Sequence, residues 1–118
     1  MKMRSDYNCP LEMTHDIIRG KWKPVILWEL SKGECSLSAL KKAIGGMSQK
    51  MLVQHLNELL EWRVIGKTVS DGYPLKSNYF LTDRGEKIFE AVSIMQSVGI
   101  EMMLEDNREE FLKEKGLL

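Results

Sequence analysis

The chain has 118 residues, of which 43% are hydrophobic and 29% charged, with 17 basic and 17 acidic side chains. This size and composition are typical of one globular domain with a real core, and they exclude a disordered chain. No apolar run approaches the ~18 residues of a membrane span, and the first residues lack the apolar stretch of a signal peptide, so we expect a cytoplasmic protein that contacts no membrane.

The zero net charge hides a division along the chain. Residues 1–87 hold 14 basic and 10 acidic residues, a balance of +4, whereas residues 88–118 hold 3 and 7, a balance of −4. A basic region suits nucleic acid, although a charge run is more often an ordinary solvated face. Charge alone therefore does not decide the function.

Four helices are predicted in the first half of the chain. The first runs from about 10 to 19, and the second opens at Pro24 and ends at Gly33. The second is apolar on nearly all its faces, which is typical of a buried central helix. Ser36 or Ser38 can cap a third helix, and Ser48 a fourth that runs to about 62. Leucines and isoleucines recur at helical spacing in both, and Gly45-Gly46 separates them. Two helices joined by a short turn, over about 36–62, form a helix-turn-helix.

A β-hairpin is predicted next, over about 64–81. Residues 64–69 are rich in β-branched side chains, 71–74 have turn chemistry, and 78–81 alternate polar and apolar. The loop between the strands should hold seven to eight residues. A hairpin that directly follows a helix-turn-helix is a wing, so we expect a mainly α fold with a small β-hairpin, a single winged-helix domain over 1–118.

The C-terminal region is predicted to be helical over about 83–115. Thr82 or Asp83 can cap a long helix, with Glu86 completing a capping box after Asp83, and Asn107 can cap a last one. The long helix carries apolar residues on more than one face. Because a second apolar face needs a partner, we expect a homodimer formed by the N-terminal and C-terminal helices; closure of a monomeric core is the alternative.

Several motifs resemble those of the HxlR-type winged helix-turn-helix transcriptional regulators, which are related to MarR-like regulators. The resemblance rests on Cys9-Pro10, Gly20-Lys21-Trp22-Lys23, Ser48-Gln49-Lys50-Met51-Leu52, and Tyr79-Phe80-Leu81-Thr82 with Gly85. It implies a bacterial or archaeal dimeric DNA-binding regulator, and for some members a response to electrophiles or oxidants through the N-terminal cysteine. The wing departs from the family pattern, since its tip carries a single basic residue, Lys76.

The polar face of the fourth helix suits an operator in double-stranded DNA. A helix start favours phosphate, Gln can bond adenine, Lys can reach guanine, and Val can touch a thymine methyl group. We expect helix 48–62 to enter the major groove, with the wing on the backbone. The candidate DNA-binding residues are Ser48, Gln49, Lys50, Val53, Gln54, Asn57, Lys41, Lys42, Lys67 and Lys76. An ordinary solvated face is the alternative interpretation.

The cysteines and histidines suggest a switch and no catalysis. Cys9 stands at a helix start, where the dipole favours a thiolate, so it is a candidate redox sensor; burial in an interface is the alternative. Cys35 is expected to pack, and His15 to be a packed or interface histidine. The spacings of these residues and His55 fit no zinc motif, and no phosphate loop or catalytic arrangement occurs, so we expect no metal, no cofactor and no enzyme.

Two other functions remain open. The winged helix could serve protein–protein contact without DNA. Alternatively, the regulator could respond to a small-molecule inducer held between the long helix and the core, in a pocket lined by Trp22, Trp28, Met95 and Met102. Aromatic and methionine side chains at such spacings more often belong to the core.

Overall fold

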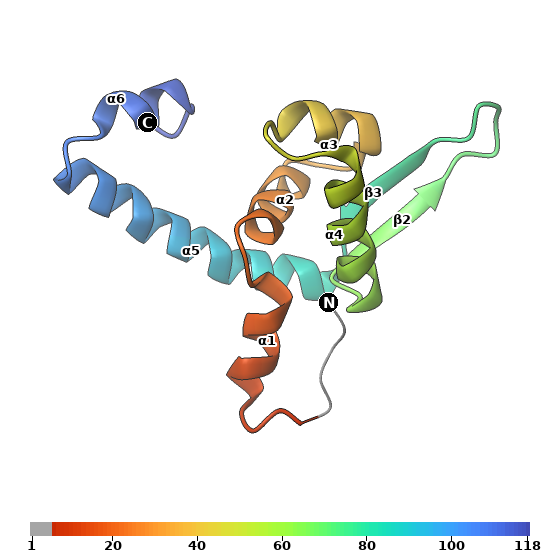
Figure 1. Cartoon of the computed structure of the whole chain (residues 1–118), viewed down its shortest axis with the longest axis horizontal. Coiled ribbons are helices and arrows are strands. Elements are labelled where there is room, and N and C mark those ends of the chain that lie inside the picture. The colour runs from red at the N-terminus through yellow and green to blue at the C-terminus, as the bar shows by residue number, and fades with distance from the viewer. Residues whose placement is uncertain (1–5) are drawn as a thin grey trace.

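The computed structural model describes residues 6–118, which form six helices around a small antiparallel sheet (Figure 1). The helices are α1 (Pro10–Ile18), α2 (Trp22–Ser31), α3 (Leu37–Ala43), α4 (Gln49–Glu61), α5 (Asp83–Glu105) and α6 (Glu109–Glu114). The strands are β1 (Cys35–Ser36), β2 (Ile65–Val69) and β3 (Ser77–Leu81). The predicted winged-helix order of helices and hairpin is confirmed.

The sheet has one more strand than the sequence predicted. Its order is β1-β3-β2, so the hairpin strands pair in register from Ile65 opposite Leu81 to Val69 opposite Ser77, and β1 adds to the free edge of β3. Cys35 therefore lies in a strand, opposite Tyr79, although its segment was expected only to connect the second and third helices. A strand of two residues is too short to show the alternation by which strands are found.

Side-chain caps set the starts of three helices. The hydroxyl oxygens of Ser36, Ser48 and Thr82 accept hydrogen bonds from the backbone N–H groups of Ala39, Met51 and Gly85, at 3.1, 3.2 and 3.1 Å. Ser36, rather than Ser38, caps α3. Thr82 caps α5, so the capping box assigned to Asp83 and Glu86 is wrong: the third residue after Thr82 is a glycine, which has no side chain to reach back.

Two helix starts differ from the prediction. α2 begins at Trp22, two residues before Pro24, because proline is tolerated anywhere in a first helical turn. α6 begins at Glu109 after Arg108, and Asn107 adopts a positive φ of 57° instead of capping it. Asparagine tolerates this left-handed conformation, which ends α5 and turns the chain.

The core gathers around α2, which contacts α1, α3, α4, α5 and β3. Ile26, Leu27 and Leu30 of α2 are buried, which confirms its central place, although Val25 is 36% exposed and Lys23 is buried instead. Across the α2–α5 contact, the rings of Trp28 and Phe89 lie 5.7 Å apart. The other fully buried apolar side chains in this cluster include Leu40, Leu52, Leu56, Leu59, Trp62 and Val64.

The expectation of no signal peptide concerns a stretch that includes residues 1–5, which lie outside the described residues. Across residues 6–118, no helix combines the length and apolar character that a bilayer crossing requires.

Candidate nucleic-acid interface

Helix α4 has one apolar face and one polar face. Leu52, Leu56 and Leu59 are fully buried against the core, and Leu60 is only partly buried. The opposite face projects outward: Ser48, Gln49, Lys50, Gln54 and Asn57 are exposed, and Val53 is partly exposed. The leucine spacing thus turns every candidate on this helix toward solvent.

The start of α4 is open to a ligand. The Ser48 hydroxyl caps the helix by accepting from the Met51 N–H, while the Ser48 carbonyl accepts from the Leu52 N–H at 3.0 Å. The exposed first turn, with Gln49 and Lys50, carries the positive end of the helix dipole. Such an end favours a phosphate oxygen.

A shallow groove of about 430 Å³ runs along the outer side of α4. It is lined by Lys50, Val53, Gln54, Asn57, Glu58 and Glu61. The first four of these residues were predicted from the sequence, whereas the two carboxylates were not. Glu58 and Glu61 follow the selected polar residues at helical spacing, so the continuation of the face along α4 was the available signal.

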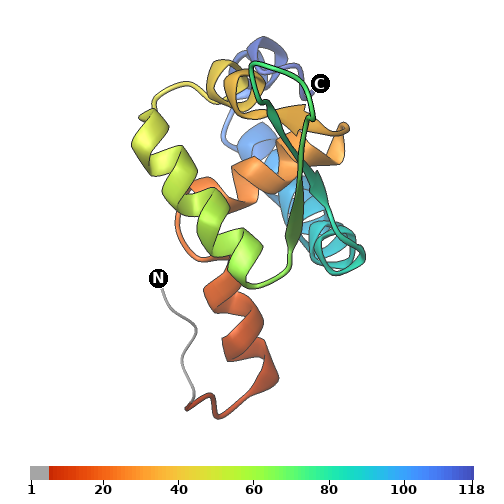
Figure 2. The same cartoon turned by 90° about the vertical axis from the view of Figure 1, so that its right-hand side faces the viewer.

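The predicted phosphate-binding lysines lie on elements next to α4. Lys41 and Lys42 lie in the last turn of α3, where Lys41 is partly exposed and Lys42 is exposed. Lys67 on β2 and Lys76, just before β3, are both exposed. The Lys67 ammonium lies 5.9 Å from the centre of the Tyr79 ring. Figure 2 shows α4 and the hairpin side by side on one face of the molecule, with α3 above α4.

The tip of the hairpin exposes two large hydrophobic side chains. Residues 70–76 connect the strands, and within them Tyr73 is fully exposed and Leu75 is 69% exposed. Lys76 is tied to Ser70 by two hydrogen bonds, one to the Ser70 hydroxyl and one from the Ser70 N–H. The wing therefore presents a closed loop with one lysine at its edge.

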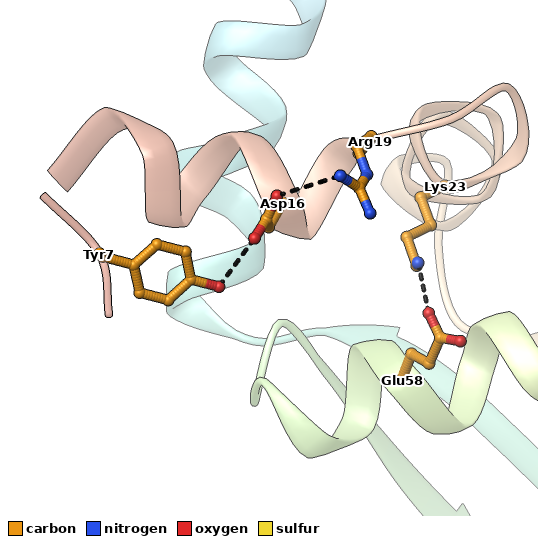
Figure 3. Close-up of polar contacts among 5 residues, drawn as sticks. All are labelled: Tyr7, Asp16, Arg19, Lys23 and Glu58. Carbon is orange, nitrogen blue, oxygen red and sulfur yellow. Dashed lines mark hydrogen bonds and ion pairs between the residues drawn. The ribbon is translucent and has the colours of Figure 1, made fainter. Parts of the chain in front are cut away.

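A buried ion pair joins α2 to α4, as Figure 3 shows. The Lys23 ammonium donates a hydrogen bond to the Glu58 carboxylate, and both side chains are at least nine-tenths buried. Burial by itself would raise the pKa of Glu58, but hydrogen bonds and nearby positive charge, with the bond from Lys23 the largest of these, outweigh burial and bring this pKa to about 2. Burial and the Lys23 charge also lower the pKa of the neighbouring His55.

Cys9 and Cys35 lie in different surroundings. Cys9 is exposed at the N-terminal end of α1, and its carbonyl accepts from the Glu12 N–H at 3.0 Å. Cys35 is partly buried in β1, where burial and then Glu29 raise the pKa of its thiol. Within residues 6–118, no group of three potential metal ligands comes together.

A wider groove, with a volume of about 930 Å³, lies between α1 and α5. Leu11, Ile17, Ile18, Ile88 and Met95 give it an apolar lining. Of the four residues predicted to line a ligand pocket, only Met95 lies here; Trp22, Trp28 and Met102 do not. His15, predicted to be a packed or interface histidine, is not packed within the single chain but exposed at this groove, and the interface role stays a prediction.

Comparison with known proteins agrees with this architecture. The model of the HxlR-like helix-turn-helix family matches residues 17–107. MalR of Fusobacterium mortiferum is 33% identical over 102 residues, which are 86% of this chain and 96% of MalR. YtcD of Bacillus subtilis, described as an uncharacterized HTH-type transcriptional regulator, is 39% identical over 85 residues, 72% of this chain and 68% of YtcD.

Two solved structures of regulators are also similar. The redox regulator HypR in its oxidized form aligns with a TM-score of 0.75 and 29% identity, over 79% of this chain and 96% of HypR. Diamide-treated YodB from Bacillus subtilis aligns with a TM-score of 0.70 and 26% identity, over 81% of this chain and 96% of YodB.

Proposed function

The chain belongs to the HxlR-like helix-turn-helix family and is a transcriptional regulator of that type, and on this premise we propose that it binds operator DNA as a homodimer. The observation that carries the proposal is the outward face of α4. Its polar side chains are exposed in a row while its leucines are buried, and the hairpin stands beside it on the same side of the molecule (Figure 2).

In this proposal α4 lies in the major groove. Gln54 bonds an adenine edge, Lys50 reaches guanine O6 or N7, and Val53 touches a thymine methyl group. Each bidentate contact of this kind contributes about 1–3 kcal/mol of discrimination between bases. Ser48, Gln49 and Asn57 complete the reading face or contact the backbone.

The backbone is held from the elements around α4. Lys41 and Lys42 of α3 and Lys67 and Lys76 of the wing are the proposed phosphate contacts, which fix the register of α4 without reading sequence. The excess of acidic residues in 88–118 keeps that end of the chain from competing for the duplex, because like charges repel the phosphates.

The exposed apolar side chains of α5 support the homodimer. Ile94, Met95, Val98 and Met102 are 66, 61, 48 and 63% exposed in the single chain. They continue the apolar groove between α1 and α5, where Leu11 is 76% exposed. A second copy seated on this surface would bury it and place two α4 helices on one duplex, with half-sites one or more turns of roughly 34 Å apart.

A redox response through Cys9 is the finer part of the proposal. Cys9 is exposed at the start of α1, next to the proposed dimer surface, and chemical oxidants can reach it. Among similar proteins, HypR is described as a redox regulator and YodB was crystallised after diamide treatment. Oxidation of Cys9 to a sulfenic acid or an intersubunit disulfide would shift how the two subunits pack and so the spacing of their reading helices.

Selection of bound fragments from a random-sequence duplex library tests the DNA-binding proposal. The protein should enrich a two-fold symmetric sequence, and its affinity for that duplex should fall steeply with salt, by about 0.9 in the log–log slope per phosphate contact. A protein that binds neither the library nor any enriched duplex at low salt would be a protein–protein module.

A further inference from the structure

Lys23 is a lysine in an unfavourable place. It stands in the first turn of α2, where the positive end of the helix dipole disfavours a cation, and it is 2% exposed. Neither helix stability nor solvation explains a charged residue there. Its side chain crosses from α2 to α4 and donates to the Glu58 carboxylate (Figure 3).

Lys23 contacts Glu58 in the last turn of α4 and Trp62, the residue at which the helix ends. Besides the bond to Glu58, its ammonium lies 5.2 Å from the centre of the Trp62 ring, and Trp62 follows Glu58 by one turn. A cation over an indole face is attracted to it, and more strongly when the pair is buried. Both contacts depend on direction, whereas the leucine packing of α4 against the core mainly requires apolar volume.

Glu58 also belongs to the groove along the reading face of α4. It lines that groove together with Lys50, Gln54 and Asn57. A carboxylate there without a nearby cation would repel the DNA phosphates. The Lys23 ammonium neutralises this charge from the core side.

We propose that Lys23 is a positioning residue for sequence recognition: through Glu58 and Trp62 it fixes the rotation of α4 about its axis, so that Gln54 and Asn57 face the bases. The inference rests on the proposed DNA-binding function and adds to it a residue that touches no DNA. It predicts that the geometry of the pair, and not its contribution to stability, determines how well the protein selects its sequence.

Replacing both partners separates geometry from stability. When a buried ion pair is replaced by apolar residues of similar volume, the protein often stays as stable as before or becomes more stable. Removing only one partner destabilises the protein, because the other charge is left buried and unpaired. Lys23→Met combined with Glu58→Met therefore keeps a filled, uncharged contact between α2 and α4 while removing its directional hydrogen bond. Lys21→Met is the matched control, because it removes a positive charge two residues away at an exposed position.

The experiment compares affinities for the duplex that wild type enriches from the random library and for a random duplex, at one salt concentration. We expect the double variant to unfold cooperatively at or above the wild-type temperature, yet to lose about tenfold or more in the ratio of the two affinities, the discrimination of one good base contact. Lys21→Met should keep the wild-type ratio.

A second variant covers the case in which the double variant does not fold. Lys23→Arg retains the charge and the pairing, but its planar, longer head cannot keep the same spacing between α2 and α4, so we expect a folded protein with a lowered ratio. A wild-type ratio in whichever variant folds overturns the role of Lys23 and leaves the proposed function intact. If wild type itself enriches no sequence, the proposed function fails, and this inference fails with it.

Discussion

A side chain on Gly85 would begin where the backbone carbonyl of Val64 already lies. A Cβ built at Gly85 would approach the Val64 oxygen to well under 3.0 Å, closer than real Cβ atoms come to a backbone oxygen. Beside this contact, the Thr82 hydroxyl lies 2.7 Å from the Arg63 carbonyl oxygen and 2.9 Å from that of Val64. The start of α5 is therefore tied to the segment between α4 and β2, which closes the base of the wing.

Gly85→Ala should destabilise the protein by about 1–3 kcal/mol, because the atom that the new methyl group meets is backbone and cannot move aside alone. The free energy of unfolding, measured by urea titration, checks this. Gly45→Ala is the matched control: nothing lies within 4 Å of a Cβ there, and the residue has no positive φ. Equal stability of the two variants would show that α5 is not held this closely to Val64.

Lys50→Ala and Gln54→Ala should weaken binding to the enriched duplex while the fold stays intact, since both side chains are exposed. We expect each variant to lose about tenfold in affinity for this duplex, but for different reasons. Loss of a base contact at Gln54 should relax sequence selection at one position. Any phosphate contact made by Lys50 should appear as a salt slope lower by about 0.9.

Lys113→Ala is the control for these two variants. Lys113 is exposed on α6 and pairs with Glu109 at 3.2 Å, so its loss removes a positive charge far from α4. Affinity equal to wild type in both α4 variants, at matched salt, would remove this helix from the reading role.

Much of the fold was readable because its periodic segments are long. Helix α4 has leucines at helical spacing over 13 residues, and α5 continues for 23, so both were predicted with nearly correct bounds. β1 was missed because two residues have no period. Asn107 was assigned as a cap from its residue type alone, although the same residue type also suits the left-handed turn that it forms.

Only the exposed half of the candidate site could be identified from the sequence. Exposed polar residues opposite a leucine stripe can be identified from spacing within one helix. The Lys23–Glu58 pair joins residues 35 positions apart, and nothing local in the sequence places a lysine of α2 beside a glutamate of α4. Long-range contacts of this kind follow from the crossing of two helices, which only the assembled core determines.

Met95→Glu should prevent dimerisation without destabilising the single chain, because Met95 is 61% exposed there and its substitution would place a charge in the proposed interface. Sedimentation at micromolar concentration should find wild type as a dimer and this variant near the 13.6 kDa of one chain. Leu75→Glu, at an apolar position on the wing tip that is 69% exposed, should remain a dimer. A monomeric wild type would refute the dimer itself.

Cys9→Ser should abolish the response of DNA binding to diamide. Cys9 is exposed, whereas Cys35 is partly buried and burial raises the pKa of its thiol, so Cys9 is the thiol that an oxidant reaches more readily. Affinity for the enriched duplex, measured with and without diamide, checks this, and Cys35→Ser should respond as wild type does. A Cys9→Ser protein that still responds would exclude this cysteine as the sensor.

The Lys23–Glu58 pair should also make stability depend on acid pH. The pKa of Glu58 is lowered from 4.5 to about 2 in the folded chain, so in this interval the unfolded chain binds more protons than the folded one. The contribution of Glu58 to stability is therefore complete above about pH 4.5 and is lost as the pH falls toward 2.

Urea titrations across this pH range should show wild type losing stability faster than Glu58→Gln, which cannot titrate. Glu61→Gln, at an exposed position on the same helix, should follow the wild-type profile. If Glu58→Gln and wild type fall in parallel, the carboxylate is not held by Lys23 in solution, and the contact proposed to orient α4 loses its electrostatic basis.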